Sequence, residues 1–155
     1  MKMFLAEDIM TKVVESTSPS STLSSISKKM ARKEISCILV VENRKPVGII
    51  SERDFVKKVL SHPKKEKILA KDIMSSPVLS IKPKETVSNA AKLMSDNKIR
   101  HILVTDNNSV KGIITETDVL RGETEYIKAH QFLQNLILAL FITILLLFVI
   151  VFRVL

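Results

Sequence analysis

Two near-identical hexapeptides open the two halves of the sequence: Leu5-Ala6-Glu7-Asp8-Ile9-Met10 and, 64 residues later, Leu69-Ala70-Lys71-Asp72-Ile73-Met74. The same offset aligns residues 8–57 with residues 72–121 without a gap, and 20 of these 50 pairs are identical. Average residue usage would give roughly three identities by chance, so the chain contains an internal duplication. A unit of about 50 residues buries little core alone. We therefore expect the two copies to pack into one body.

Both copies show the same succession of apolar patterns, which predicts a β-α-β-β-α unit and an α/β (α+β) fold class. Apolar residues at helical spacing predict a helix after Thr22 and another after Thr86, and both threonines suit the N-cap position. A second helix is expected to begin at Glu52 in the first copy and at Glu116 in the second. The predicted strands are residues 13–16, 37–41, 47–50, 78–81, 102–105 and 110–114.

The segments Gly48-Ile49-Ile50-Ser51-Glu52-Arg53-Asp54 and Gly112-Ile113-Ile114-Thr115-Glu116-Thr117-Asp118 resemble a known signature. They are similar to the Gly-h-h-[Ser/Thr]-x-x-Asp pattern, where h is hydrophobic, of CBS domains, a family named after cystathionine β-synthase. The pair of repeats, at residues 5–60 and 69–122, resembles a Bateman module. One departure is that Leu39 and Leu103 stand where the family commonly has proline. We expect this departure to affect strand geometry more than binding.

The resemblance implies a regulatory module whose clefts, between the repeats, bind AMP, ADP, ATP or S-adenosylmethionine, with no cofactor required. It assigns Ser51 and Asp54 to one site, and Thr115 and Asp118 to the other. The chemistry fits, because a strand end that opens a helix offers unsatisfied N–H groups to a phosphate. An acidic residue three positions later can accept hydrogen bonds from a ribose diol.

The strand residues Ile50 and Ile114 are predicted to wall the purine. An alternative interpretation needs no ligand at all. Ser-x-x-Asp and Thr-x-x-Asp at a helix start also form a capping-box-like arrangement, which stabilises a helix by about 1 kcal/mol. A duplication copies a cap as readily as it copies a binding site.

Basic residues near the predicted clefts are candidates for contacting phosphate. We single out Lys12, Arg53, Arg100 and His101. Arg53 lies inside the first motif, whereas Thr117 takes its place in the second. This difference predicts unequal sites.

Few residues suggest other chemistry. Cys37 is the one cysteine, so a disulfide framework within the chain is impossible, and we expect it to be a small buried strand residue. His62 and His130 have no acidic or sulfur partners at ligand spacing, so no metal site is predicted. Neither a Ser-His-Asp set, nor paired catalytic carboxylates, nor a P-loop is recognisable, which argues against an enzyme.

The C-terminal end differs in composition from the rest of the chain. Residues 132–155 contain four non-apolar side chains, which explains how a chain with a net charge of +8 has a mean hydropathy of +0.20. As a helix, residues 132–152 would span about 31 Å, close to the thickness of a bilayer core. We predict a single transmembrane helix at 132–153, preceded by a stalk at 123–131 after a helix break at Gly122.

These features predict a non-catalytic nucleotide sensor, anchored by its C-terminus in a membrane with the repeats in the cytoplasm. A homodimer and a membrane transporter or channel as partner are expected. The alternative is a ligand-independent structural or dimerisation module at the membrane. Nucleic-acid binding is disfavoured, because 18 of the 24 basic residues are lysines spread along the chain without aromatic interleaving.

Overall fold

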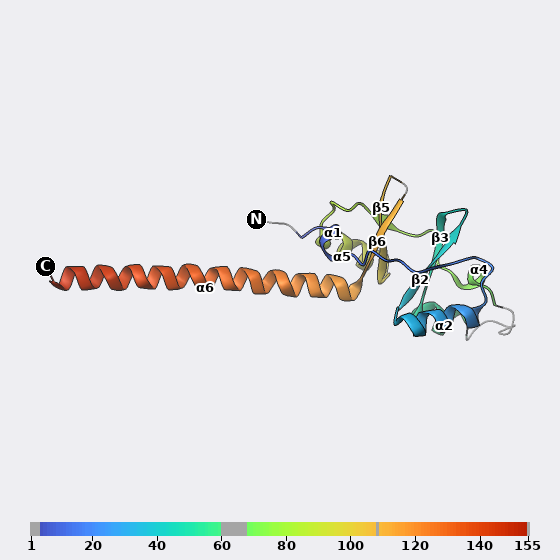
Figure 1. Ribbon diagram of the computed structural model, residues 1–155, viewed down its shortest axis with the longest axis horizontal. Helices are drawn as coiled ribbons and strands as arrows, with labels where there is room; N and C mark the ends of the chain where they lie inside the picture. Colours follow the sequence, from blue (N-terminus) through green and yellow to red (C-terminus); the bar gives the residue numbers. More distant parts are fainter. Residues whose placement is uncertain (1–3, 60–67, 108, 155) are drawn as a thin grey trace.

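A computed structural model describes residues 4–59, 68–107 and 109–154 of the chain, with side chains left out at residues 123, 125, 126, 129 and 147–154. Two similar α/β repeats lie side by side, and one long helix extends away from the second (Figure 1). The predicted end of the first repeat, at residue 60, lies outside the described residues.

The two repeats contain the predicted β-α-β-β-α succession. Each has a three-stranded sheet in which the first strand runs parallel to the second and the second antiparallel to the third. The first repeat consists of β1 (Ser16–Thr17), α2 (Leu23–Lys33), β2 (Cys37–Glu42), β3 (Lys45–Ser51), α3 (Glu52–Asp54) and a π-helical turn η1 (Phe55–Val59). The second consists of β4 (Ser80–Ile81), α5 (Val87–Asp96), β5 (His101–Asp106), β6 (Ser109–Thr115) and α6 (Glu116–Val154).

Local sequence explains where the helices begin. The hydroxyl of Thr22 accepts a hydrogen bond from the Ser25 amide, and that of Thr86 accepts one from the Asn89 amide, as the N-cap prediction requires. The first strand of each repeat is shorter than predicted. Val13, for example, is 78% exposed and precedes β1.

The two repeats exchange short helices, since each repeat begins with a helix that packs on the other repeat. Helix α1 (Ala6–Ile9) belongs to the first repeat in sequence but packs on the second, where the Ala6 amide donates to the Glu85 carbonyl at 2.8 Å. Helix α4 (Ala70–Ile73) opens the second repeat but packs on the first, where the Ala70 amide donates to the Ser21 carbonyl at 2.9 Å. Figure 1 shows α1 beside α5, the helix of the second repeat. Each repeat is therefore completed by a segment of the other.

The methionine of each hexapeptide packs against the motif glycine of the other repeat, which explains why the two sequence features occur together. A side chain at Gly48 would come within 2.5 Å of the Met74 sulfur, and one at Gly112 within 2.8 Å of the Met10 sulfur. The methionine of each Asp-Ile-Met sequence thus lies over the glycine of the other repeat. Only a residue without a side chain leaves room for that contact.

Apolar side chains from both sheets form a separate hydrophobic cluster where the two sheets meet. Leu39 and Leu103, at the positions where the family commonly has proline, are 3% and 1% exposed and pack with Ile113. Partly buried residues of both sheets surround them: Val14, Cys37, Val41, Ile49, Val78 and Val110. The two leucines therefore help to hold the repeats together.

The predicted helix break at Gly122 is wrong. Helix α6 continues through Gly122 to Val154. The glycine is buried, and a side chain there would lie 3.0 Å from the Ile9 Cγ2 atom of α1. Gly122 thus allows α1 to approach α6 closely without ending the helix.

Beyond the repeats, α6 projects as a solitary helix (Figure 1). From Phe132 to Leu146, its large apolar side chains are 47–71% exposed. Among the parts of the chain that are described, no helix is long and apolar enough to cross a membrane. This finding does not support the transmembrane helix predicted at residues 132–153. Side chains are described for residues 132–146 of that range and not for residues 147–153.

We predict that Leu103→Ala destabilises the joint between the sheets. Truncating a fully buried leucine costs about 2–5 kcal/mol, and urea unfolding followed by circular dichroism would measure the loss. Leu120→Ala is the matched control, since Leu120 is 59% exposed and such a change alters the free energy of unfolding by about 0.5 kcal/mol or less. Equal effects of the two substitutions would contradict the role given to Leu103.

Candidate functional site

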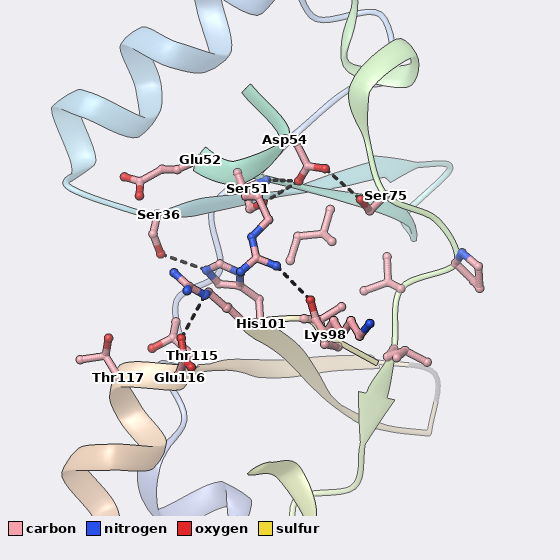
Figure 2. Close-up of a pocket in the computed structure, with 17 residues that line it drawn as sticks. Ser36, Ser51, Glu52, Asp54, Ser75, Lys98, His101, Thr115, Glu116 and Thr117 are labelled. Carbon is pink, nitrogen blue, oxygen red and sulfur yellow. Dashed lines mark hydrogen bonds and ion pairs between the residues drawn. The ribbon is translucent and has the colours of Figure 1, made fainter. Parts of the chain in front are cut away.

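A cleft of about 360 Å³ lies between the two repeats. One side comes from the end of β3 and the start of α3 in the first repeat, namely Ile49 and residues 51–54. The other side comes from the second repeat, from Ser75 and the residue ranges 77–79, 98–101 and 115–117. Ser36 of the first repeat also lines the cleft. Figure 2 shows these side chains converging from both repeats. The cleft therefore exists only because the repeats are paired.

The predicted pair Ser51 and Asp54 lies on this cleft and is locked together. Oδ2 of Asp54 accepts hydrogen bonds from the Ser51 amide at 2.8 Å and from the Ser51 hydroxyl at 2.6 Å. Oδ1 accepts from the Ser75 hydroxyl at 3.0 Å and forms an ion pair with Lys58 at 2.9 Å. All four acceptor positions of the carboxylate are thus occupied.

Asp54 is 8% exposed, and opposing effects set its pKa. Burial acts to raise the pKa, but hydrogen bonds from Ser51, Lys58 and Ser75 outweigh it, and the pKa lies below its ordinary value of 3.8. A lowered pKa means that ionised Asp54 stabilises the fold above the unfolded-state pKa. That contribution is lost as the pH falls through the folded-state pKa.

The second motif forms the same local structure with fewer partners. Oδ2 of Asp118 accepts from the Thr115 amide at 2.9 Å and from its hydroxyl at 2.7 Å, and the Asp118 amide donates to the Thr115 hydroxyl. The positions that match Lys58 and Ser75 are Gly122 and Thr11. Thr115 lines the cleft, whereas Asp118 is not among its lining residues. Both motifs therefore act as caps, as the alternative interpretation of the sequence holds.

Backbone amides at the start of α3 are already engaged. The Glu52 amide donates to the Ser36 carbonyl, and the Glu116 amide of the second motif donates to the Arg100 carbonyl, both at 3.0 Å. Together with the amides held by Asp54 and Asp118, these donors are not open to a phosphate as the sequence suggested. These four amides therefore contribute nothing to the recognition of an anion, which makes the basic side chains that line the cleft the main candidates.

Three of the four predicted basic residues line the cleft. Nη1 of Arg53 donates to the Lys98 carbonyl at 3.0 Å, and Nε of Arg100 pairs with Glu116 at 3.1 Å. His101 lies deeper, where the Ser36 hydroxyl is 3.0 Å from its Nε2 atom. Lys12 is not brought to this cleft, because the adjoining Thr11 pairs with Ile113 in the second repeat.

Burial has the largest effect on the pKa values of His101 in β5 and Cys37 in β2, which occupy matching positions in the two repeats. Burial lowers the pKa of His101, while the Asp54 carboxylate acts in the opposite direction, so a neutral imidazole is favoured. Burial raises the pKa of Cys37 to about 12, and the charges of Asp118 and Glu52 add to the effect. A thiol with so high a pKa is inert, which agrees with the structural role expected for Cys37.

The residues predicted to wall a purine lie elsewhere. Ile50 and Ile114 are both fully buried within the cores of their own repeats. Side chains alternate along a strand, so the neighbouring Ile49 lines the cleft instead, with Val78 and Leu79 opposite. Ser51 and Asp54 of the first motif thus line the cleft, but on β3 the side chain that faces it is Ile49 and not Ile50.

Sequence reasoning also missed Lys98 and Ser75, which line the cleft. The repeat carried a signal for Lys98, because its counterpart at the 64-residue offset is Glu34, a reversal of charge. Both residues have left-handed backbone conformations, with φ of 54° and 53°. Within the described residues, no group of three or more His, Cys, Asp or Glu side chains could hold a metal ion.

Comparison with known proteins agrees with this architecture. The family model for the CBS domain matches residues 6–61 and 70–124. The chain therefore belongs to the CBS domain family. It contains two such domains in tandem, the arrangement called a Bateman module. Modules of this family are generally regulatory and non-catalytic, and they bind adenosyl ligands.

Three proteins illustrate what the chain is similar to. The chain is 41% identical over 109 residues to an uncharacterized protein of Methanopyrus kandleri, covering 68% of this chain and 56% of that protein. A crystallised CBS domain protein, NE2398, is 27% identical with a TM-score of 0.73, covering 79% and 99% of the two chains. A hexameric CBS-CP12 protein from bloom-forming cyanobacteria is 27% identical with a TM-score of 0.70, covering 77% and 71%. The chain spans about half the length of the curated relatives that it matches, between 38% and 63% for three of them.

We predict that Ser75→Ala raises the pKa of Asp54, since it removes one of the hydrogen bonds that lower it. The shift would be measured by NMR titration of the Asp54 side-chain carboxyl carbon. Ser80→Ala, at an exposed position of β4, should leave the titration of Asp54 unchanged. An unchanged Asp54 pKa in Ser75→Ala would show that the hydroxyl does not stabilise the carboxylate.

Proposed function

We propose that the chain is a non-catalytic regulatory module that binds an adenine nucleotide, or a related adenosyl compound, in the cleft between its repeats. The observation that carries this proposal is the cleft itself. It combines an apolar wall with basic side chains, and both repeats contribute to it. Ligand sites are typically concave and largely apolar, with a few placed polar groups.

The cleft offers a partner for each part of a nucleotide. Ile49, Val78 and Leu79 supply apolar surface for the base. The Ser75 hydroxyl and Asp54 lie where a ribose diol can exchange hydrogen bonds with them. Because the carboxylate is already saturated, the ribose must displace Ser75 or share its hydroxyl. Arg53 and Lys98 face the remaining, phosphate-bearing end.

A ligand bound in this cleft would affect how the two repeats are oriented relative to each other. Its contacts to both repeats favour one relative orientation of the two sheets over others, provided that its affinity differs between those orientations. The Arg100–Glu116 ion pair lies at the start of α6. A change at the cleft can therefore reach the long helix directly.

Isothermal titration of the full chain in detergent micelles with AMP, ADP, ATP and S-adenosylmethionine tests this proposal. We expect saturable binding of at least one of these compounds, and loss of affinity in Arg53→Ala by about tenfold or more, as expected for a hydrogen bond to a charged group. Lys28→Ala, a change of equal charge on the exposed surface of α2, should bind as the unmodified chain does. Absence of binding at millimolar concentrations would overturn the proposal.

We also propose that α6 attaches the module to a membrane, with the repeats on the cytoplasmic side and a transporter or channel as the regulated partner. The support is the composition of residues 132–153 and the exposure of apolar side chains from Phe132 to Leu146. Apolar residues occur on all sides of the helix, which suits a lipid environment better than a surface with one wet face.

Membrane attachment predicts that the expressed chain sediments with membranes and resists extraction by alkaline carbonate. A chain carrying Leu140→Lys and Leu145→Lys should be released, because charge in the middle of such a helix disfavours insertion by roughly 2.5–3.5 kcal/mol per residue. Lys71→Ala, on the surface of the repeats, is the control and should stay with the membrane. Quantitative release of the unmodified chain by carbonate would contradict the attachment.

A ligand-independent role in assembly is the second candidate. Ser51, Asp54, Thr115 and Asp118 satisfy one another without a ligand, and one relative is hexameric. Such a module would form the same homodimer with and without nucleotide. Light scattering alongside the titrations separates the two roles.

A further inference from the structure

Lys58, in the turn η1, links the first motif to the exchanged helix α4, although it is not among the residues that line the cleft. Its ammonium group donates to the carbonyls of Ile73 and Met74, at 2.8 and 3.2 Å, at the C-terminal end of α4. The same group forms an ion pair with Oδ1 of Asp54 at 2.9 Å. The last carbonyls of a helix have no partner within the helix, so Lys58 supplies one while it also holds the carboxylate.

Ser75 completes a triangle with these two charged groups. Its hydroxyl accepts a hydrogen bond from the Lys58 ammonium at 3.1 Å and donates one to Oδ1 of Asp54 at 3.0 Å, the second of which Figure 2 shows. The Asp54 side chain is 11% exposed in this arrangement, and partly buried charges are screened less than exposed ones. The triangle therefore holds Ser75 firmly to the first motif.

Ser75 is also part of the wall of the cleft. It lies in the segment that leads from α4 to β4, and Pro77, Val78 and Leu79 of that segment line the cleft with it. Its amide donates to the Ile49 carbonyl at 2.8 Å, and the Ile49 amide donates to the Ser75 carbonyl at 3.0 Å. The place of this wall relative to β3 thus depends on a bridge that adjoins the triangle.

The second repeat shows which of these contacts the motif itself requires. There the corresponding bridge joins Thr11 to Ile113, through two amide–carbonyl hydrogen bonds at 2.9 and 3.0 Å. The cap made by Asp118 is present as well, although the position that matches Lys58 is Gly122. Cap and bridge therefore form without a lysine, so neither of them explains the contacts that Lys58 makes.

We propose that Lys58 is a positioning residue for the cleft, which fixes the segment after α4, and with it one wall of the cleft, by holding that segment to Asp54. It exerts this role in the free chain, independently of the identity of the ligand. A ligand hydroxyl that displaces Ser75 from Asp54 would leave Lys58 in contact with both the carboxylate and α4. The wall would thereby stay docked while the cleft is filled.

Amide hydrogen exchange of the full chain in detergent micelles, followed by NMR without ligand, tests this role. In Lys58→Met, we expect the amides of Ser75 and Ile49 to exchange faster by about tenfold or more, as the loss of a hydrogen bond to a charged group implies. The amides of Thr11 and Ile113 are an internal reference in the same spectra. Their rates should stay unchanged, because their bridge has no lysine beside it.

Matched variants separate positioning from a general effect on charge or folding. Lys58→Arg keeps the charge and the donors, so it should restore most of the protection of Ser75. Lys28→Met, on the exposed surface of α2, should alter neither bridge. Circular dichroism would verify that each variant is folded. If Lys58→Met does not fold, Lys58→Gln, which keeps a donor but no charge, takes its place with the same expected direction of change.

Two results would overturn the inference. One is unchanged exchange of Ser75 and Ile49 without the lysine. The other is equal acceleration of these amides and of Thr11 and Ile113, which would indicate a loss of global stability and no specific effect on the wall. Failure of AMP, ADP, ATP and S-adenosylmethionine to bind would overturn the proposed nucleotide function and leave the exchange result unaffected.

Discussion

The contact of each Asp-Ile-Met methionine with a glycine of the other repeat is the constraint on which the rest of the structure depends. Met74 lies over Gly48, and Met10 lies over Gly112, at distances that no side chain on the glycine would allow. This contact docks α1 and α4 onto the opposite repeats. The sheets are thereby brought face to face, and the cleft forms between their strand ends.

The repeat made most of the fold predictable from sequence. An offset of 64 residues without a gap, combined with apolar periodicity, predicted the β-α-β-β-α unit, both N-caps and the packing of two units into one body. The exchange of α1 and α4 was not predictable, because a four-residue helix has too short a pattern to show which sheet it covers. The prediction of a helix break at Gly122 was wrong for a related reason. A glycine is read as a helix end unless the residue that packs against it, here Ile9, is known.

At the cleft, sequence predicted the motif and most of the basic residues, but not their geometry. Ile50 and Ile49 are equally apolar, and only the register of β3 shows which of them faces the cleft. Nor does spacing show whether Asp54 is open to a ligand or already saturated by Ser51, Ser75 and Lys58. Those contacts join residues from two repeats, and they depend on the same pairing that Met74 and Gly48 establish. Lys98 was not predicted either, because its place at the cleft depends on the pairing of the repeats. The one trace of it in the sequence is the reversal of charge relative to its counterpart Glu34.

Methyl NMR of the full chain titrated with AMP or ATP tests the central claim most directly. Ile49 and Ile99 line the cleft, whereas Ile26 is buried in the core of the first repeat and does not line it. We expect the methyl signals of Ile49 and Ile99 to shift on saturation while those of Ile26 stay largely in place. Unchanged signals of Ile49 and Ile99 at saturating nucleotide would contradict binding between the repeats.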